Sequence, residues 1–268
     1  MPGWVQGRVA LVTGASRGIG VGIARCLAKE GAKVAVAART KEGLAATCRE
    51  IEALGAQAMA VRVDLSREAD ATRMVQDVGK AWGPVEILVN NAGVHGAADF
   101  SEHYPETTAD WEAAFRVNAL ARVWACDAVL PSMKERKWGK IINVASIAGI
   151  EGTPVHMAYS AAKAAEINYT QSLAKDIGRY GINVNVVLPG LVYTDMIGSL
   201  QKHIATKYNR PGGESPKRWF DGIIKRTTPL QREQTVDDIG WMVTFLCSPL
   251  AREVHGQAIN VDGGMRLH

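Results

Sequence analysis

The chain has 268 residues, of which 47% are hydrophobic and 22% charged, with a formal net charge of +4. This composition excludes a disordered or collagen-like chain, and no apolar run approaches the ~18 residues that span a bilayer. The four cysteines lie far apart, without a CxxC motif, so neither a disulfide framework nor a metal site is expected. Basic residues are dispersed and residues 1–8 resemble no signal peptide. We therefore expect a cytoplasmic protein that binds neither nucleic acid nor membrane.

Short apolar runs alternate along the chain with segments of helical spacing. Ile23 and Leu27, for example, precede Gly31, which is a helix-stop signal, and helices are also predicted at 156–177 and 236–246. Runs typical of strands buried on both faces occur at 9–13, 34–37, 58–61, 87–89, 141–144, 184–187 and 258–261. Repeated strand–helix–strand units predict one α/β domain over residues 1–268. Its expected fold is a doubly wound, Rossmann-type parallel sheet of about seven strands with helices on both faces.

Residues 196–228 interrupt this alternation. Polar residues, a Pro-Gly-Gly segment at 211–213 and Ser215-Pro216 break any long periodic pattern there. A loop of this length in a compact domain is usually functional. We expect residues 191–228 to form a lid over the substrate, with Trp219, Phe220 and Ile223 as candidates for its inner face.

A glycine-rich segment at 13–20, with the sequence TGASRGIG, follows the first predicted strand and opens the first helix. A helix N-terminus at the carboxyl end of a strand offers free N–H groups and a positive dipole end to a pyrophosphate. Glycines at 14, 18 and 20 let the backbone approach such a ligand closely. The segment predicts a dinucleotide site, although its GxxxGxG spacing differs from the general GxGxxG pattern.

The same segment also contains GxSxG, the nucleophile-elbow pattern of α/β-hydrolases, with Ser16 as the nucleophile. His255 is available late in the chain as a general base. The elbow would lie at the first strand, however, rather than in the middle of the fold, which disfavours the hydrolase hypothesis.

The end of the second predicted strand bears on which dinucleotide is bound. An NAD site usually has an acidic residue there, on the ribose 2′-hydroxyl. Here the segment reads Ala38-Arg39-Thr40, and the first acidic residue is Glu42. Ala38 leaves space for a 2′-phosphate, and Arg39 and Arg17 supply cations for it. NADP(H) is therefore favoured over NAD(H).

Tyr159 and Lys163 have the i, i+4 spacing that places two side chains on one helix face. A nearby ammonium stabilises a phenolate, so we expect Lys163 to lower the pKa of Tyr159 from its usual value near ~10. Such a phenol is suited to general acid–base catalysis near neutral pH.

Taken together, these motifs resemble the short-chain dehydrogenase/reductase family in its compact single-domain form. The resemblance covers nearly the whole chain and includes NNAG at 90–93, the Tyr159–Lys163 pair and Pro189-Gly190. It implies a catalytic set of Asn118, Ser146, Tyr159 and Lys163. With the arguments above, it implies a cofactor site formed by Gly14, Ser16, Arg17, Gly18, Ile19, Gly20, Ala38, Arg39, Thr40, Asp64, Leu65, Asn91, Ala92, Gly93, Tyr159, Lys163, Pro189, Gly190, Val192 and Thr194.

The family resemblance also implies a role for each catalytic residue. Ser146 would position a substrate carbonyl, and Tyr159 would give it a proton as hydride arrives from the nicotinamide. Lys163 would hold the nicotinamide ribose, and Asn118 would hold a water that links Lys163 to solvent. No metal is required.

The resemblance further implies a carbonyl or secondary-alcohol substrate, similar to those of 3-oxoacyl-thioester reductases and broad ketone reductases. The helices expected at 110–136 and 156–179 correspond to the family's interface helices, which implies a homotetramer or homodimer. An NAD-dependent alcohol dehydrogenase and a non-catalytic dinucleotide-binding regulator remain as alternatives. A regulator would be expected to lack Ser146, Tyr159 or Lys163, yet all three are present.

Overall fold

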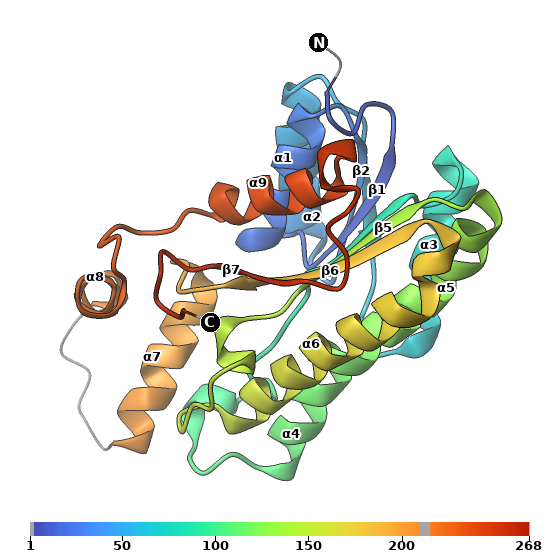
Figure 1. The fold of residues 1–268 in the computed structure, drawn as a ribbon. Coiled ribbons are helices and arrows are strands. Elements are labelled where there is room, and N and C mark those ends of the chain that lie inside the picture. The colour runs from blue at the N-terminus through green and yellow to red at the C-terminus, as the bar shows by residue number, and fades with distance from the viewer. Residues whose placement is uncertain (1–2, 209–214, 268) are drawn as a thin grey trace.

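The computed structural model describes residues 3–208 and 215–267. Their strands form one parallel, seven-stranded sheet in the order β3-β2-β1-β4-β5-β6-β7 (Figure 1). The strands are β1 (Val9–Thr13), β2 (Lys33–Ala38), β3 (Ala58–Arg62), β4 (Ile87–Asn90), β5 (Gly139–Val144), β6 (Ile182–Pro189) and β7 (Ala258–Val261). The predicted α/β class and the parallel sheet are confirmed, and β1 and β7 have the expected bounds.

Helices cover both faces of the sheet (Figure 1). In the described ranges they are α1 (Ile19–Lys29), α2 (Lys41–Ala53), α3 (Glu68–Trp82), α4 (Thr108–Phe115), α5 (Ala121–Arg136), α6 (Met157–Ile177), α7 (Asp195–Lys207), α8 (Pro216–Thr227) and α9 (Val236–Cys247). A π-helical turn, Arg116–Leu120, joins α4 to α5. The longest of these helices, α6, corresponds to the segment predicted at 156–177.

Alternating side chains along each strand belong to two separate cores. On β1, Val12 packs in one cluster with Ile23 of α1 and Val243 of α9, whereas Leu11 packs in another with Val129 of α5. All five of these side chains are fully buried. Strands covered on both faces are apolar at most positions, which is why they appear as short apolar runs in the sequence.

The order of strands places a crevice between β1 and β4. From β1 the chain builds outward to β2 and β3, and then returns to β4 on the other side of β1. In open α/β sheets, ligands bind at such a reversal, outside the carboxyl ends of the strands. The segments that follow β1, β4, β5 and β6 therefore meet at one edge of the sheet.

The expectation of a long loop at 196–228 is wrong for the residues that the structure describes. Most of this segment forms α7 and α8, and its Pro-Gly-Gly at 211–213 lies outside the described residues. Ser215 caps α8, and Phe220 and Ile224 bury the apolar side of that helix against Ile197 of α7. The apolar positions have helical spacing, but they are few and lie among many exposed polar residues. For this reason the two helices were not predicted from the sequence.

Candidate active site

The glycine-rich turn leads directly from β1 into α1, as predicted. Gly14 and Gly18 have φ of +67° and +60°, a backbone conformation that favours glycine. A Cβ on Gly14 would lie 2.6 Å from the Cα of Ala92, and one on Gly20 would lie 2.4 Å from the carbonyl oxygen of Gly14. The turn therefore requires glycine, and it presents the N-terminus of α1 at the crevice.

The NNAG segment at 90–93 is held against this turn by hydrogen bonds. The Thr13 hydroxyl accepts from the backbone N–H groups of Asn91 and Ala92, at 3.0 and 3.1 Å. The Asn91 amide in turn donates to the carbonyl oxygen of Thr13 at 2.9 Å. The next glycine, Gly93, lies beside Lys163, since a Cβ on it would be 3.8 Å from Nζ. The loop thus joins the turn to the Tyr–Lys helix.

The end of β2 has the charge pattern expected from the sequence. Ala38 is its last residue, and the exposed Arg39 follows it. Arg39 also acts on Asp64, whose pKa is lowered by hydrogen bonds from Ser66 and by nearby arginines, although burial opposes the change. The structure therefore places Asp64 near Arg39, while the last residue of β2, Ala38, carries no charge.

The segment after β6 closes the other side of the crevice. Thr194 lies next to the turn, because a Cβ on Gly18 would be 3.2 Å from its methyl carbon. Gly190 donates its backbone N–H to Val261 of β7 at 2.9 Å, and Val192 is buried. Arg17 forms an exposed ion pair with Asp195 at 3.3 Å. The predicted cofactor residues from β1, β2, β4 and β6 thus lie around one crevice.

Tyr159, Ser146 and Lys163 lie together at the carboxyl end of β5. The Tyr159 hydroxyl hydrogen-bonds to Ser146, which also caps the short helix that follows β5. The ammonium of Lys163 lies 5.7 Å from the Tyr159 ring centroid and donates to the carbonyl oxygen of Val144 at 2.8 Å. The structure thus assembles three of the four predicted catalytic residues in contact.

The expected lowering of the Tyr159 pKa by Lys163 is wrong in this structure. Burial raises the pKa of Tyr159 to about 12, although the hydrogen bond from Ser146 opposes the change. Burial also lowers the pKa of Lys163 to about 8, against the effect of Glu166, whose carboxylate lies 2.9 Å from Nζ. The lysine charge is thus paired with Glu166 rather than directed at the phenol.

Asn118 lies in the π-helical turn, fully buried beside the NNAG loop. Its side-chain amide donates to the carbonyl oxygen of Val94 at 2.7 Å and accepts the Val94 N–H at 3.0 Å. The side chain is therefore used to fix the loop after β4. The expected role of Asn118 in holding a water stays a prediction.

Two histidines that the sequence analysis did not single out flank Tyr159. The ring centroids of His95 and His156 lie 4.9 and 5.1 Å from that of Tyr159. Burial, reinforced by neighbouring histidines, lowers their pKa values to about 3 and about 4. His203 of α7 joins this group through Phe100, on which it stacks. Proximity to NNAG and to Tyr159 in the sequence was the available signal for His95 and His156.

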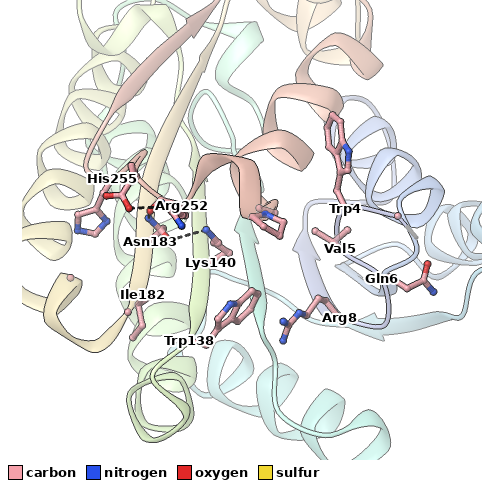
Figure 2. A pocket seen from close by; sticks show the side chains of 16 residues that line it. Trp4, Val5, Gln6, Arg8, Trp138, Lys140, Ile182, Asn183, Arg252 and His255 are labelled. Atoms are coloured by element: carbon pink, nitrogen blue, oxygen red, sulfur yellow. Dashed lines mark hydrogen bonds and ion pairs between the residues drawn. The ribbon is translucent and has the colours of Figure 1, made fainter. Parts of the chain in front are cut away.

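The hydrolase alternative fails on geometry. His255 uses both ring nitrogens, accepting the N–H of Val184 and donating to the carbonyl oxygen of Ala174. It lines a cavity of about 710 Å³ at the starts of β5 and β6, together with Lys140 and Asn183 (Figure 2). Ser16 follows the carboxyl end of β1, at the opposite edge of the parallel sheet, so the two residues cannot act together.

Comparison with known proteins gives the same class as the fold and site. The family model for short chain dehydrogenase matches residues 8–205. The chain therefore belongs to the short-chain dehydrogenase family, whose members are oxidoreductases acting on carbonyl and alcohol groups. No helix among the described residues has the length and apolar character needed to cross a membrane.

Individual relatives match over almost their whole length. The chain is 33% identical over 262 residues to a 3-oxoacyl-[acyl-carrier-protein] reductase of Aquifex aeolicus, covering 97% of this chain and 98% of the relative. It is 36% identical to a solved actinorhodin polyketide ketoreductase with NADPH, with a TM-score of 0.87 and 97% of each chain covered. An L-sorbose reductase of Gluconobacter frateurii complexed with NADPH and L-sorbose gives 30% identity, a TM-score of 0.88 and full coverage of both chains.

Proposed function

We propose that this protein is an NADP(H)-dependent reductase of ketones, acting reversibly on the corresponding secondary alcohols. The observation that carries the proposal is the contact of Tyr159 with Ser146 and its proximity to Lys163, at the edge of the sheet where the glycine-rich turn lies. When bound, the cofactor supplies the hydride, and the protein supplies orientation and the proton.

The protonation state of the tyrosine suits the reductive direction. With a pKa of about 12, Tyr159 holds its proton at neutral pH and can donate it to a carbonyl oxygen. Ser146, hydrogen-bonded to the same hydroxyl, would orient that oxygen. In the oxidative direction Tyr159 must first lose its proton, so alcohol oxidation should gain more than ketone reduction from alkaline pH.

The residues around the crevice fit a dinucleotide with a 2′-phosphate. The turn at Gly14 and Gly20 has no room for side chains, which leaves backbone N–H groups at the start of α1 for a pyrophosphate. Arg39 and Arg17 would hold the 2′-phosphate, and Ala38 places no charge against it. Two of the similar solved proteins were determined with NADPH, which supports this assignment.

Other parts of the fold would complete the active site. We infer that α7 and α8 act as the lid over the substrate, because His203 of α7 stacks on Phe100 of the loop after β4. Phe100 and His203 are 103 positions apart in the sequence, so their contact joins α7 to the loop after β4. We also propose a homotetramer built through α4, α5 and α6, in line with the family resemblance.

The names of the relatives support a class of substrate. The three described above are a 3-oxoacyl-[acyl-carrier-protein] reductase, a polyketide ketoreductase and an L-sorbose reductase, and 3-oxoacyl groups, polyketides and L-sorbose all carry more than one oxygen. Neutral imidazoles both donate and accept hydrogen bonds, so His95 and His156 are suited to a second oxygen of this kind.

NADPH oxidation with a panel of simple ketones, ketoses and 3-oxoacyl thioesters tests the proposal, with NADH run in parallel. We expect turnover with NADPH and a preference for ketones that carry a second oxygen. Faster turnover with NADH would favour the NAD-dependent alternative. Tight NADPH binding without turnover of any member would favour a dinucleotide-binding regulator.

A further inference from the structure

Beside the proposed catalytic residues lies a group of three buried charges. Lys163 and Arg122 are each 2% exposed and Glu166 is 1% exposed. Removing a charged side chain from water is costly unless the charge is paired. Two cations and one carboxylate in a protein interior therefore need an explanation beyond the packing of α5 against α6.

The carboxylate of Glu166 bridges the two cations. One of its oxygens, Oε2, lies 2.9 Å from Nζ of Lys163, and the other, Oε1, lies 2.8 Å from Nε of Arg122. Thr170 donates to the backbone carbonyl of Glu166 one turn later. Each oxygen of this carboxylate thus has its own cation, and the bridge ties α5 to α6.

The other end of Arg122 reaches the segments that line the crevice. Its Nη2 donates to the carbonyl oxygen of Ala92 in the NNAG loop, at 2.5 Å. Its Nη1 donates to the carbonyl oxygen of Val117, the residue before Asn118. A planar guanidinium can hold these two carbonyl oxygens in a fixed arrangement while it forms an ion pair with the Glu166 carboxylate. Arg122 and Glu166 therefore connect the ammonium of Lys163 to the NNAG loop and to the π-helical turn that carries Asn118.

We propose that Arg122 and Glu166 are positioning residues, whose ion pair holds the Lys163 ammonium beside Tyr159. The inference rests on the proposed function, since it assigns a role toward Lys163 in that reaction. Neither residue touches the reacting atoms in this arrangement; both act through Lys163.

The two residues should act on Lys163 in opposite directions. The carboxylate of Glu166 raises the pKa of Lys163, and the guanidinium of Arg122 lowers it, while burial lowers it overall to about 8. Within residues 3–208 and 215–267, the other titratable groups that face Lys163 are Tyr159 on the same helix and His95 after β4. His95 is neutral at the pH values of interest, because burial lowers its pKa to about 3.

The test compares Glu166→Gln with Arg122→Met. In cofactor-free protein labelled with [13C]lysine, the Lys163 Cε resonance, assigned with Lys163→Arg, reports its titration directly. We expect the midpoint to fall by about one pH unit or more in Glu166→Gln and to rise in Arg122→Met. The alkaline limb of kcat/KM for ketone reduction should move in the same two directions.

A matched control and a second variant keep the test decisive. Glu86→Gln removes a carboxylate from the Arg8–Glu86 ion pair at the opposite edge of the sheet, and should leave the Lys163 midpoint unchanged. Should a single variant fail to fold because it leaves a buried charge unpaired, the double variant Arg122→Met/Glu166→Gln removes both charges together. Its midpoint should lie between those expected for the two single changes.

The possible outcomes separate this inference from the proposed function. Shifts of the same sign in both single variants, or no shift in any folded variant, would overturn the positioning role. Wild-type protein that never oxidises NADPH would refute the proposed function instead. In that case the NMR titration, which needs no turnover, would still report whether Glu166 and Arg122 control Lys163.

Discussion

At the scale of single residues, the behaviour of Tyr159 follows from a competition between burial and polar contacts. Burial disfavours the phenolate and raises the pKa to about 12, whereas the hydrogen bond from Ser146 favours it. Lys163, the group expected from the sequence to favour the phenolate, has its charge balanced by Glu166 at 2.9 Å. The side chain is thus a proton donor at rest, as ketone reduction requires.

We expect cofactor preference to depend on a single residue, Ala38. Replacing Ala38 by Asp places a carboxylate at the end of β2, where it would repel a 2′-phosphate and accept a hydrogen bond from a 2′-hydroxyl. We predict that the ratio of kcat/KM for NADPH to that for NADH falls by about tenfold or more. The control is Ala53→Asp, which adds the same charge at an exposed position on α2. An unchanged ratio in Ala38→Asp would contradict the assignment of the 2′-phosphate site.

At the scale of elements, the central strands could be predicted because burial on both faces makes most of their positions apolar. Helices α7 and α8 could not, because each presents only a narrow buried side. In α8 only Phe220 and Ile224 are buried, Ile223 between them is partly exposed, and the polar residues 225–227 follow. Of the three residues expected on the inner face of the lid, Phe220 is buried, Trp219 packs against the same cluster and Ile223 is only partly buried. The inner face itself stays a prediction.

The parts of the site that lie in continuous sequence motifs could be predicted. The parts that depend on the packing of distant helices could not. The glycine-rich turn and the Tyr159–Lys163 pair are local, and their geometry follows from one strand end or one helix. The bridge from Arg122 to Glu166 joins residues 44 positions apart, so no spacing rule points to it. Each residue alone has the pattern of a solvated helix charge, and only the packing of α5 on α6 shows that both are buried.

If α7 and α8 form a separate lid, a core substitution between them should lower the stability of these two helices alone. Phe220 is fully buried between α7 and α8, so Phe220→Ala should destabilise this pair of helices by about 3–5 kcal/mol. Hydrogen exchange should become faster in α7 and α8 while the strands stay protected, and KM for the ketone should rise. Lys225→Ala, at an exposed position of the same helix, serves as the control. Uniform loss of protection across the sheet would contradict a separate lid.

At the scale of the whole molecule, the layer of helices that includes α4, α5 and α6 exposes several large apolar side chains. Trp111, Leu120 and Met157, at 38–43% exposure, are carried by α4, the turn before α5, and α6. Large apolar side chains left partly exposed on one face suit an interface between subunits. This is the layer that the family resemblance assigns to the interface.

We predict that Leu120→Glu breaks this assembly. Light scattering after gel filtration should give a tetramer for the wild type and a smaller species for the variant, because burying an unpaired carboxylate in an interface is unfavourable. Leu54→Glu is a matched control, since Leu54 is also 43% exposed but lies at the end of α2, on the other layer of helices. Equal masses for wild type and Leu120→Glu would rule out this interface.

The central step of the proposed reaction is the transfer of a proton from the Tyr159 hydroxyl to a bound carbonyl. The most direct measurement is turnover of Tyr159→Phe at saturating NADPH, with NADPH binding measured separately by fluorescence. Loss of the hydroxyl should reduce kcat by about a thousandfold or more while the dissociation constant for NADPH changes little. A variant that reduces ketones at the wild-type rate would show that the proton comes from another group.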